Sequence, residues 1–479
     1  MPDRKTTLIW LRRDLRLDDH PGFYSAAAHG RAVLPVFIWS PEEEGDWTSG
    51  AASKWWLHHS LLSLSKDLAA CGSKLIIRKG RALTVLMDLC KETGADSVGW
   101  GRLYEPAELV RGRKIEHALK AEDLRVEVYH SSLLAEPWEI MRAPGQPYKV
   151  FTAFWNRFRS ACAVGKPLPR PRKFSAPSRW PKSLSVADLK LLPKKDWAKG
   201  FRAAWVPGEA GALKNLRRFC AVSGAYRTAR DRPGRPGTSR LSPHLHFGEV
   251  SPRKIWHALR RRSGSESYLR QLVWREFAHH LLYYFPHTPE RPLRSDFEGF
   301  PWREDGGALR AWQRGKTGYP LVDAGMRELW HTGWMHNRVR MIAASFLVKH
   351  LLMPWQEGAK WFWDTLVDAD LANNTMGWQW VAGCGADAAP YFRIFNPVLQ
   401  GEKFDPQGEY VRRWVPELSR VPDRWIHRVW EAPGDVLKDA GVRLGKDYPH
   451  PVVDHEGARR KALLAYAKMK KISGDGLRK

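Results

Sequence analysis

The stretch Thr7-Leu-Ile-Trp-Leu11, with Ala32-Val-Leu-Pro-Val-Phe-Ile-Trp39 after it, decides the fold of the first part of the chain. Both are short apolar runs rich in β-branched and aromatic residues, and similar runs follow at 74–78, 97–101 and 125–129. Helix-period patterns lie between them at 58–70, 82–91 and 107–121. Alternation of buried strands with helices is typical of a parallel sheet with helices on both faces. Residues 1–133 are therefore predicted to form a Rossmann-like α/β domain.

The rest of the chain follows other patterns. No GxGxxG motif follows the first apolar run, so a dinucleotide-binding site of the usual Rossmann kind is not predicted there. Segment 151–187 holds eight Lys/Arg and five Pro without Asp or Glu, and we interpret it as part of an extended basic linker over 134–211. Beyond it, helices are expected at 213–223, 251–262, 268–285, 321–332, 337–350, 356–367 and 456–471. They predict an all-α C-terminal domain over 212–475.

Composition narrows the class of protein. The 479 residues suit two or three domains, and 78 Lys+Arg against 51 Asp+Glu give a net charge of +27. Such a surplus indicates a polyanionic partner, either nucleic acid or an acidic membrane. The five cysteines show no metal-ligand spacing and no disulfide framework, so no metal site is expected. No signal peptide and no apolar run of membrane-spanning length is found, which favours the cytoplasm.

Three segments are rich in residues that carry chemistry. Segment 364–405 interleaves carboxylates and amides with Trp378, Trp380 and other aromatic residues, at what we interpret as helix-breaking spacing. In Gly333-Trp-Met-His-Asn-Arg-Val-Arg-Met341, helical spacing places Asn337 and Met341 on one face. Gly237-Thr-Ser-Arg-Leu-Ser242 precedes helical sequence and offers hydroxyl and backbone N–H groups to a phosphate.

These segments carry a resemblance to the photolyase/cryptochrome family. It also rests on Trp10-Leu-Arg-Arg-Asp-Leu-Arg-Leu-Asp-Asp19, Trp274-Arg-Glu-Phe277, Gly315-Lys-Thr-Gly-Tyr-Pro320 and 387–397, and it spans nearly the whole chain. Trp55-Trp-Leu-His-His-Ser60 and Val381-Ala-Gly383 are most similar to bacterial class III cyclobutane pyrimidine dimer (CPD) photolyases. The resemblance implies an α/β domain, a helical FAD-binding domain, and light-driven splitting of a dimer flipped out of DNA by an electron from reduced FAD.

The resemblance also assigns roles. It implies cofactor contacts for the residues matching the flavin site: Tyr226, Thr238, Ser239, Arg240, Leu241, Ser242, Arg275, Trp334, Asn337, Arg340, Asp368, Asp370 and Asn374. Within this set Asp368 and Arg340 match an ion pair beside the flavin, and Asn374 matches the residue that faces its N5. Trp378, Trp355 and Trp302 match a chain of tryptophans that passes electrons to oxidised flavin, to which Tyr391 could add a side branch.

The implied substrate site consists of Gln271, Trp274, Asn337, Arg338, Met341 and Trp380. Trp274 and Trp380 match the indoles that flank the dimer. Asn337 stands where (6-4) photolyases are expected to have a proton-donating His, so (6-4) repair is disfavoured. Most CPD photolyases carry Glu at the position of Gln271. An amide donates to a thymine carbonyl but cannot act as an acid, and we expect somewhat reduced repair efficiency.

Partners and alternatives complete the prediction. Arg159, Arg338, Arg393, Lys403 and Arg412 are candidates for DNA phosphate contacts. The resemblance implies a methenyltetrahydrofolate antenna, although Ala107-Glu108 stands where one subgroup has Asn-Glu; Trp39, Trp55 and Tyr104 mark another place for it. A monomer is expected. A cryptochrome-like photoreceptor remains an alternative, disfavoured by the substrate residues and by the short sequence after the last predicted helix. A basic nucleic-acid-binding protein without catalysis is the second.

Overall fold

The computed structural model describes residues 5–388 and 392–475, which fold as two compact units. The first, here called the sheet unit, comprises Met1–Gly224, Ser239–Pro286 and Val367–Asp370. The second, the helical unit, comprises Ala225–Thr238, His287–Leu366 and Leu371–Lys479. Each unit draws on segments that are far apart in the sequence. The predicted domain boundaries at residues 133 and 211 remain a prediction.

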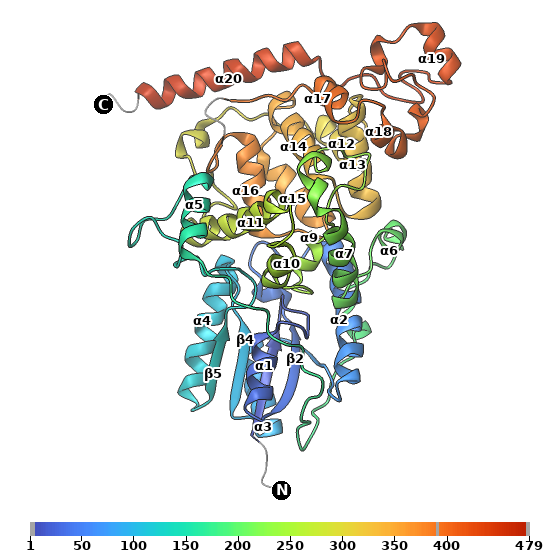
Figure 1. Ribbon diagram of the computed structural model, residues 1–479. Coiled ribbons are helices and arrows are strands. Elements are labelled where there is room, and N and C mark those ends of the chain that lie inside the picture. The colour runs from blue at the N-terminus through green and yellow to red at the C-terminus, as the bar shows by residue number, and fades with distance from the viewer. Residues whose placement is uncertain (1–4, 389–391, 476–479) are drawn as a thin grey trace. The chain divides into compact units, whose positions relative to one another are not determined.

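The sheet unit contains the predicted parallel sheet (Figure 1). Its strands are β1 (Thr6–Leu11), β2 (Ala32–Trp39), β3 (Ile76–Lys79), β4 (Ser97–Gly101) and β5 (Arg125–Tyr129). They lie in the order β3-β2-β1-β4-β5, with Leu8 opposite Leu34 on one side and Val98 on the other. The prediction of a Rossmann-like α/β sheet is confirmed.

Strand residues alternate between the two faces of the sheet. Leu8 and Trp10 point to the core shared with α3 (Ala82–Thr93) and α4 (Pro106–Ala121). Ile9 faces α1 (Pro21–Ala28), where a Cβ on Gly22 would lie 3.2 Å from its Cδ1 atom. Both faces are covered, which explains why the strands read as continuous apolar runs. Helix α1 was not predicted, and α2 (Ala51–Ala70) begins seven residues before the predicted start at residue 58.

The prediction that segment 134–211 is an extended linker is wrong in part. Helix α5 (Phe151–Ala161) buries Phe151, Phe154, Trp155 and Phe158, a spacing that places all four on one helical face. Helix α6 (Lys199–Ala204) and the start of α7 (Glu209–Val222) also lie in this segment. Basic residues and prolines dominated its composition, and they obscured the aromatic periodicity. Helices α9 (Ser242–His246), α10 (Pro252–Leu259) and α11 (Glu266–Tyr284) complete the described α-helices of this unit.

The described part of the helical unit is helical, as predicted. Its α-helices are α8 (Tyr226–Ala229), α12 (Gly306–Gln313), α13 (Pro320–Thr332), α14 (Asn337–Ser345), α15 (Trp355–Thr365), α16 (Leu371–Ala382), α17 (Pro397–Phe404), α18 (Glu409–Trp414), α19 (Gly434–Ala440) and α20 (His455–Asp475). The expected helix 337–350 ends as a π-helical turn, Phe346–His350. Helix α16 runs through a segment for which helix-breaking spacing was expected, so that reading is wrong.

The Gly315-Lys-Thr-Gly-Tyr-Pro320 motif has a structural role in this unit. The buried Asp323 carboxylate accepts hydrogen bonds from Thr317 N and Oγ1 (both 2.7 Å), Gly318 N (3.0 Å) and the Tyr448 hydroxyl (2.6 Å). A buried carboxylate needs such donors to offset its lost hydration. Among the described residues, no helix is both long and apolar enough to cross a membrane.

Candidate functional site

The sheet unit contributes the loop Ser239–Ser242. Ser239 Oγ accepts hydrogen bonds from the Tyr268 hydroxyl (2.9 Å) and from Leu241 N (3.3 Å), which leaves its own O–H to donate elsewhere. Arg240 adopts a left-handed φ of 57°, and its guanidinium carbon lies 4.1 Å from the centre of the Trp205 ring. Ser242 then begins α9. The loop thus has the donors expected for phosphate binding.

Asp370 is a buried anion in the same unit. Its Oδ2 atom lies 3.5 Å from His279 Nε2 and 3.7 Å from His246 Nδ1. Burial alone would raise the pKa of Asp370, but His279, His246 and Arg275 outweigh it and hold this pKa well below its usual range. Burial lowers the pKa of His279 to about 4. Asp370 is therefore ionised at neutral pH.

Arg275 and Asp368 are the other predicted cofactor residues of the sheet unit. Arg275 Nη1 donates to the Ser132 carbonyl at 2.8 Å and lies 3.4 Å from the carboxylate of Glu276. The Asp368 side chain is buried. The expected Asp368–Arg340 ion pair joins residues of different units and remains a prediction.

The helical unit also contains predicted cofactor residues. Four of them are Tyr226, Thr238, Trp334 and Arg340. Tyr226 and Trp334 are buried, and Arg340 Nε donates to the Met335 carbonyl at 2.8 Å. The guanidinium carbon of Arg340 lies 5.8 Å from the centre of the Trp334 ring. Two large buried rings and a held cation are compatible with a bound aromatic cofactor.

Helix α16 positions Asn374 and Trp378 one turn apart. Asn374 Nδ2 donates to the Ala359 carbonyl of α15 at 3.0 Å, so its amide oxygen is the end left to meet another donor. Trp378 lies against Gly358 of α15, where an added Cβ would be 2.0 Å from its Cη2 atom. Its ring packs edge-on to Phe362 at 5.0 Å and to Trp312 at 6.2 Å. Close packing fixes both side chains.

Trp355 and Trp302 lie in the same unit as Trp378. Trp355 is the first residue of α15 and is buried, whereas Trp302 is half-buried and packs against Phe300 with ring centres 4.3 Å apart. Of the three indoles, Trp378 and Trp355 are equally buried and Trp302 alone reaches the surface, so Trp302 is the one that could take electrons from a donor in solvent. Tyr391 lies outside the described residues.

Trp274 of α11 is the predicted substrate residue with the clearest geometry in the sheet unit. Its ring stacks on Phe151 of α5 with centres 3.6 Å apart and planes inclined by 9°. One face of the indole is thereby covered, and a substrate can use only the other. Gln271, one turn earlier on α11, is half-buried, and its Nε2 donates to the Ser267 carbonyl at 3.4 Å.

Asn337, Met341 and Trp380 are the corresponding residues of the helical unit. Asn337 is exposed at the start of α14, and its Nδ2 lies 3.8 Å from Met341 Sδ, so the predicted shared face is confirmed. Trp380 is half-buried and donates Nε1–H to the Asp387 carbonyl at 3.0 Å. The substrate candidates named so far are thus partly exposed, and six of the thirteen cofactor candidates are buried: Tyr226, Ser239, Leu241, Trp334, Asp368 and Asp370.

Comparison with known proteins identifies the family of the chain. Residues 7–172 match a model described as DNA photolyase, and residues 268–468 match the FAD binding domain of DNA photolyase. The deoxyribodipyrimidine photo-lyase of Agrobacterium fabrum is 49% identical over 476 residues, 97% of this chain and 98% of that protein. The chain belongs to the photolyase/cryptochrome family. Cryptochrome-2 of Arabidopsis thaliana is 42% identical over 97% of this chain and 78% of its own length.

Solved structures of the family have the same fold. A bacterial class III photolyase from Agrobacterium tumefaciens superposes with a TM-score of 0.95 at 48% identity, covering 98% of this chain and 99% of that one. The α/β unit and the helical FAD-binding domain expected from the photolyase resemblance are therefore confirmed.

The cations proposed for photolyase-type DNA binding divide into two groups. Arg159, Arg393 and Lys403 are exposed. Arg338 donates from Nη2 to Asp231 at 2.8 Å with its guanidinium 4.3 Å from the Phe404 ring centre, and Arg412 donates to Asp423 at 2.7 Å. The pairs with Asp231 and Asp423 compete with any phosphate for these two arginines.

Three of the residues considered for a photolyase antenna site, Glu108, Trp55 and Tyr104, are buried within the protein. Glu108 accepts from Arg12 Nη1 at 3.0 Å and from Arg111 Nη2 at 2.6 and 2.7 Å. Trp55 and Tyr104 are buried, whereas Trp39 is half-buried at the end of β2. Of these aromatic residues, Trp39 has the most accessible ring, and the antenna site remains a prediction.

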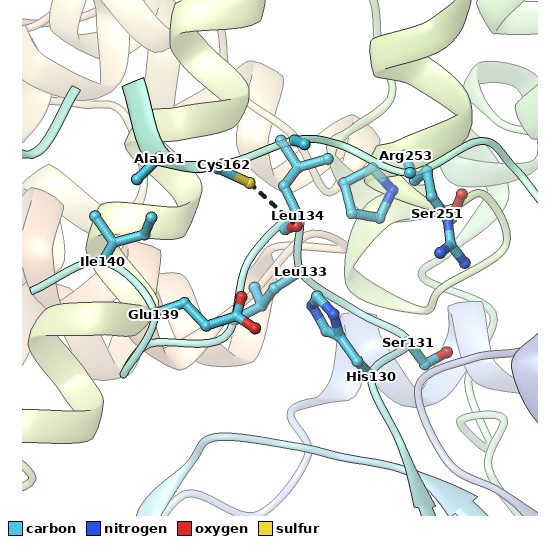
Figure 2. Close-up of a pocket in the computed structure, with 13 residues that line it drawn as sticks. His130, Ser131, Leu133, Leu134, Glu139, Ile140, Ala161, Cys162, Ser251 and Arg253 are labelled. Atoms are coloured by element: carbon cyan, nitrogen blue, oxygen red, sulfur yellow. Dashed lines mark hydrogen bonds between the residues drawn. The ribbon is translucent and has the colours of Figure 1, made fainter. Parts of the chain in front are cut away.

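A cavity of about 440 Å³ in the sheet unit contains none of the predicted site residues (Figure 2). His130, Glu139, Cys162 and Arg253 are among the residues around it. Arg253 Nη2 pairs with Asp19 at 2.7 Å, and a Glu139 oxygen accepts from Glu136 N at 2.9 Å. These polar groups already serve the fold, so the cavity does not define the photolyase site.

Sequence reasoning missed three residues that shape the site. Phe151 covers one face of Trp274, Gly358 makes room for Trp378, and Asp231 holds Arg338. The aromatic spacing of 151–158 could have revealed Phe151. No local pattern identifies Gly358 or Asp231, because each acts on a residue far away in the sequence.

Proposed function

We propose that this protein is a deoxyribodipyrimidine photo-lyase that repairs cyclobutane pyrimidine dimers in DNA with light. The observation that carries the proposal is the partly exposed pair Asn337 and Met341 on α14, with Asn337 Nδ2 3.8 Å from Met341 Sδ. An amide and a thioether can contact a neutral dimer by hydrogen bonding and apolar packing. Neither group can supply the proton that (6-4) repair requires.

FAD, when bound, supplies the light-driven electron that splits the dimer and then recovers it. The proposed duties of the chain are binding and positioning. The Ser239 hydroxyl, whose oxygen accepts from Tyr268, would donate its O–H to a phosphate oxygen, and the Asn374 amide oxygen, held by the bond to Ala359, would accept an N–H at the centre of the flavin. The Asn374 side chain carries no charge, so it does not repel an anionic flavin.

The tryptophans form the proposed electron route. Trp378, Trp355 and Trp302 would pass electrons inward to restore the reduced cofactor. Exchanging Trp378 for Phe keeps an aromatic ring but removes an oxidisable indole, and we expect it to slow photoreduction strongly. Unchanged photoreduction of the W378F protein would exclude this route.

The lesion site would use one face each of Trp274 and Trp380, with Gln271 donating to a carbonyl. The base pairs themselves would not be read, because phosphate contacts carry affinity without sequence information. Arg159, Arg393 and Lys403 are the exposed candidates for those contacts, whereas Arg338 and Arg412 would have to share a carboxylate partner. A monomer acting on DNA in the cytoplasm, with a folate antenna near Trp39, completes the proposal.

The decisive experiment is blue-light repair of an oligonucleotide that carries one thymine dimer, with purified, reduced, FAD-loaded protein. Restoration of the undamaged thymines in light, and none in the dark, is expected. N337A should weaken binding of the damaged strand more than that of undamaged DNA. Bound flavin without repair would contradict the proposal.

A cryptochrome-like photoreceptor is the second candidate, supported by 42% identity to a cryptochrome over 97% of this chain. It predicts a light-dependent change in the protein without repair. The same oligonucleotide assay therefore separates the two functions.

A further inference from the structure

Gln379, near the end of α16, has a side chain that is 2% exposed and hydrogen-bonded within the helical unit. Its Nε2 donates to the carbonyls of Thr288 at 2.7 Å and Arg291 at 2.9 Å, and its Oε1 accepts from Leu293 N at 2.9 Å. Both N–H groups of the amide and one lone pair of its oxygen are therefore in use. One side chain thus attaches the last turns of α16 to a segment that lies far away in the sequence.

The backbone carbonyl of Gln379 binds the turn that follows α16. It accepts hydrogen bonds from the N–H groups of Gly383, Cys384 and Gly385, at 2.9, 3.0 and 3.1 Å. Gly385 packs so closely that an added Cβ would lie 2.8 Å from Gln379 Cβ. The turn is also joined to the distant segment directly, because Arg294 N donates to the Cys384 carbonyl at 2.9 Å. The side chain and the backbone of Gln379 therefore hold the two segments together.

This turn leads to the residue that holds the Trp380 indole. Trp380 Nε1 donates to the carbonyl of Asp387 at 3.0 Å, and Asp387 has a left-handed φ of 50°. The indole is half-buried, so close packing does not surround it on all sides. Its orientation also depends on where the turn places the Asp387 carbonyl.

We infer that Gln379 is a positioning residue for Trp380 and sets the angle at which the indole meets a pyrimidine dimer. The inference rests on the proposed photolyase function and on the lesion site proposed with it. Gln379 acts through Trp380 and has no contact of its own with the dimer. The gain is preorganisation, because a ring that is already held in its binding orientation loses little conformational freedom when the dimer stacks on it.

A purely structural role for Gln379 makes a different prediction, because Trp378 is held independently. The Trp378 ring packs against three residues of α12 and α15, which are Trp312, Gly358 and Phe362. Loss of the Gln379 hydrogen bonds should therefore displace Trp380 and leave the proposed electron route intact. A general loosening of the helical unit would disturb both indoles.

The test measures binding of the full-length, FAD-loaded protein, in the dark, to two duplexes of one sequence, with and without a thymine dimer. Q379M has a side chain of similar length without the amide. It should reduce the preference for the dimer duplex about tenfold, a scale set by the stacking of a base on an aromatic ring. Photoreduction of the oxidised flavin should be unchanged. In the W380A background, Q379M should change the preference by less than about twofold.

Q356L is the matched control. Gln356 Nε2 donates to the Glu290 carbonyl of the same segment at 3.2 Å, but Gln356 has no link to the turn that holds Trp380. Its substitution should leave the preference for the dimer duplex unchanged. G385A is a second variant in case Q379M does not fold, since its methyl group presses on Gln379 and should lower the preference in the same selective way.

Two results overturn the inference. One is an equal loss of preference on Q379M substitution in the wild-type and W380A backgrounds, and the other is a fall in photoreduction that parallels the fall in preference. A normal wild-type preference that neither Q379M nor G385A alters refutes the role of Gln379 and leaves the proposed function standing. A wild-type protein without any preference for the dimer duplex shows that the proposed function is wrong, and the inference falls with it.

Discussion

Substitution of Gly358 by Ala tests how α15 and α16 hold Trp378. The new Cβ would lie 2.0, 2.4 and 2.5 Å from the Cη2, Cζ3 and Cζ2 atoms of Trp378. Carbon atoms normally pack at about 3.5–4.0 Å. The indole or one helix must therefore move by about 1.5 Å, and overpacking of this kind costs about 1–3 kcal/mol.

Gly377→Ala is the matched control. Gly377 lies inside α16 and is exposed, with no atom near the position of an added Cβ. Both substitutions gain about 1 kcal/mol of helix propensity, so their difference isolates the steric overlap. We expect G377A to be slightly more stable than the wild type, and G358A to lie about 1–3 kcal/mol below G377A.

Urea unfolding followed by far-ultraviolet circular dichroism measures this difference. The displaced indole should also slow photoreduction of the oxidised flavin in G358A but not in G377A. Equal free energies of unfolding for the two variants, with photoreduction unchanged in both, would show that Gly358 does not position Trp378. Loss of stability with normal photoreduction would restrict the role of Gly358 to folding.

Three further predictions follow from single side chains. Gln271→Glu should raise the quantum yield of dimer repair, because an acid can stabilise developing charge at a thymine carbonyl; a large loss of repair would contradict this. Burial raises the pKa of Glu276 to about 7 from 4.5, so the folded protein holds the proton more tightly and stability falls as pH rises through this window. In E276Q this loss of stability, which is about 3 kcal/mol at most, should be absent when the free energies of unfolding at pH 5 and pH 7 are compared. An unchanged dependence of the free energy of unfolding on pH in E276Q would refute the role of Glu276. K403A should reduce the slope of log affinity for DNA against log salt by about 0.9, whereas R412A, whose arginine already pairs with Asp423, should change it little; equal effects would argue against the division of cations made here.

Local patterns were sufficient for much of the fold. The β-rich runs around Leu8 and Leu34 identified their strands, because a strand buried on both faces needs apolar residues without interruption. Helices α11 and α13 were also found from their sequences, although each is buried on more than one face: residues 276–282 and 320–326 are buried without interruption. Segment 151–161 was misread because its basic composition outweighed the spacing of Phe151, Phe154 and Phe158.

For the functional site, the sequence identified candidate residues but only some of the residues that they contact. The i, i+4 spacing of Asn337 and Met341 was enough to place them on one face. The same spacing rule could not show that Asn374 bonds to Ala359 or that Arg338 pairs with Asp231. Those contacts join different elements, and their geometry depends on how the helices pack.

By itself, the sequence determined the kinds of element, the basic character of the chain and the chemistry that its motifs can perform. These properties depend on residue type and on short-range periodicity. Tertiary structure alone decided that Phe151 covers one face of Trp274, that Gly358 admits Trp378, and that the Gln379 side chain binds the segment 288–293. Such contacts arise where distant segments pack to exclude water, and close packing at a few ångströms leaves no mark on the local pattern of either segment.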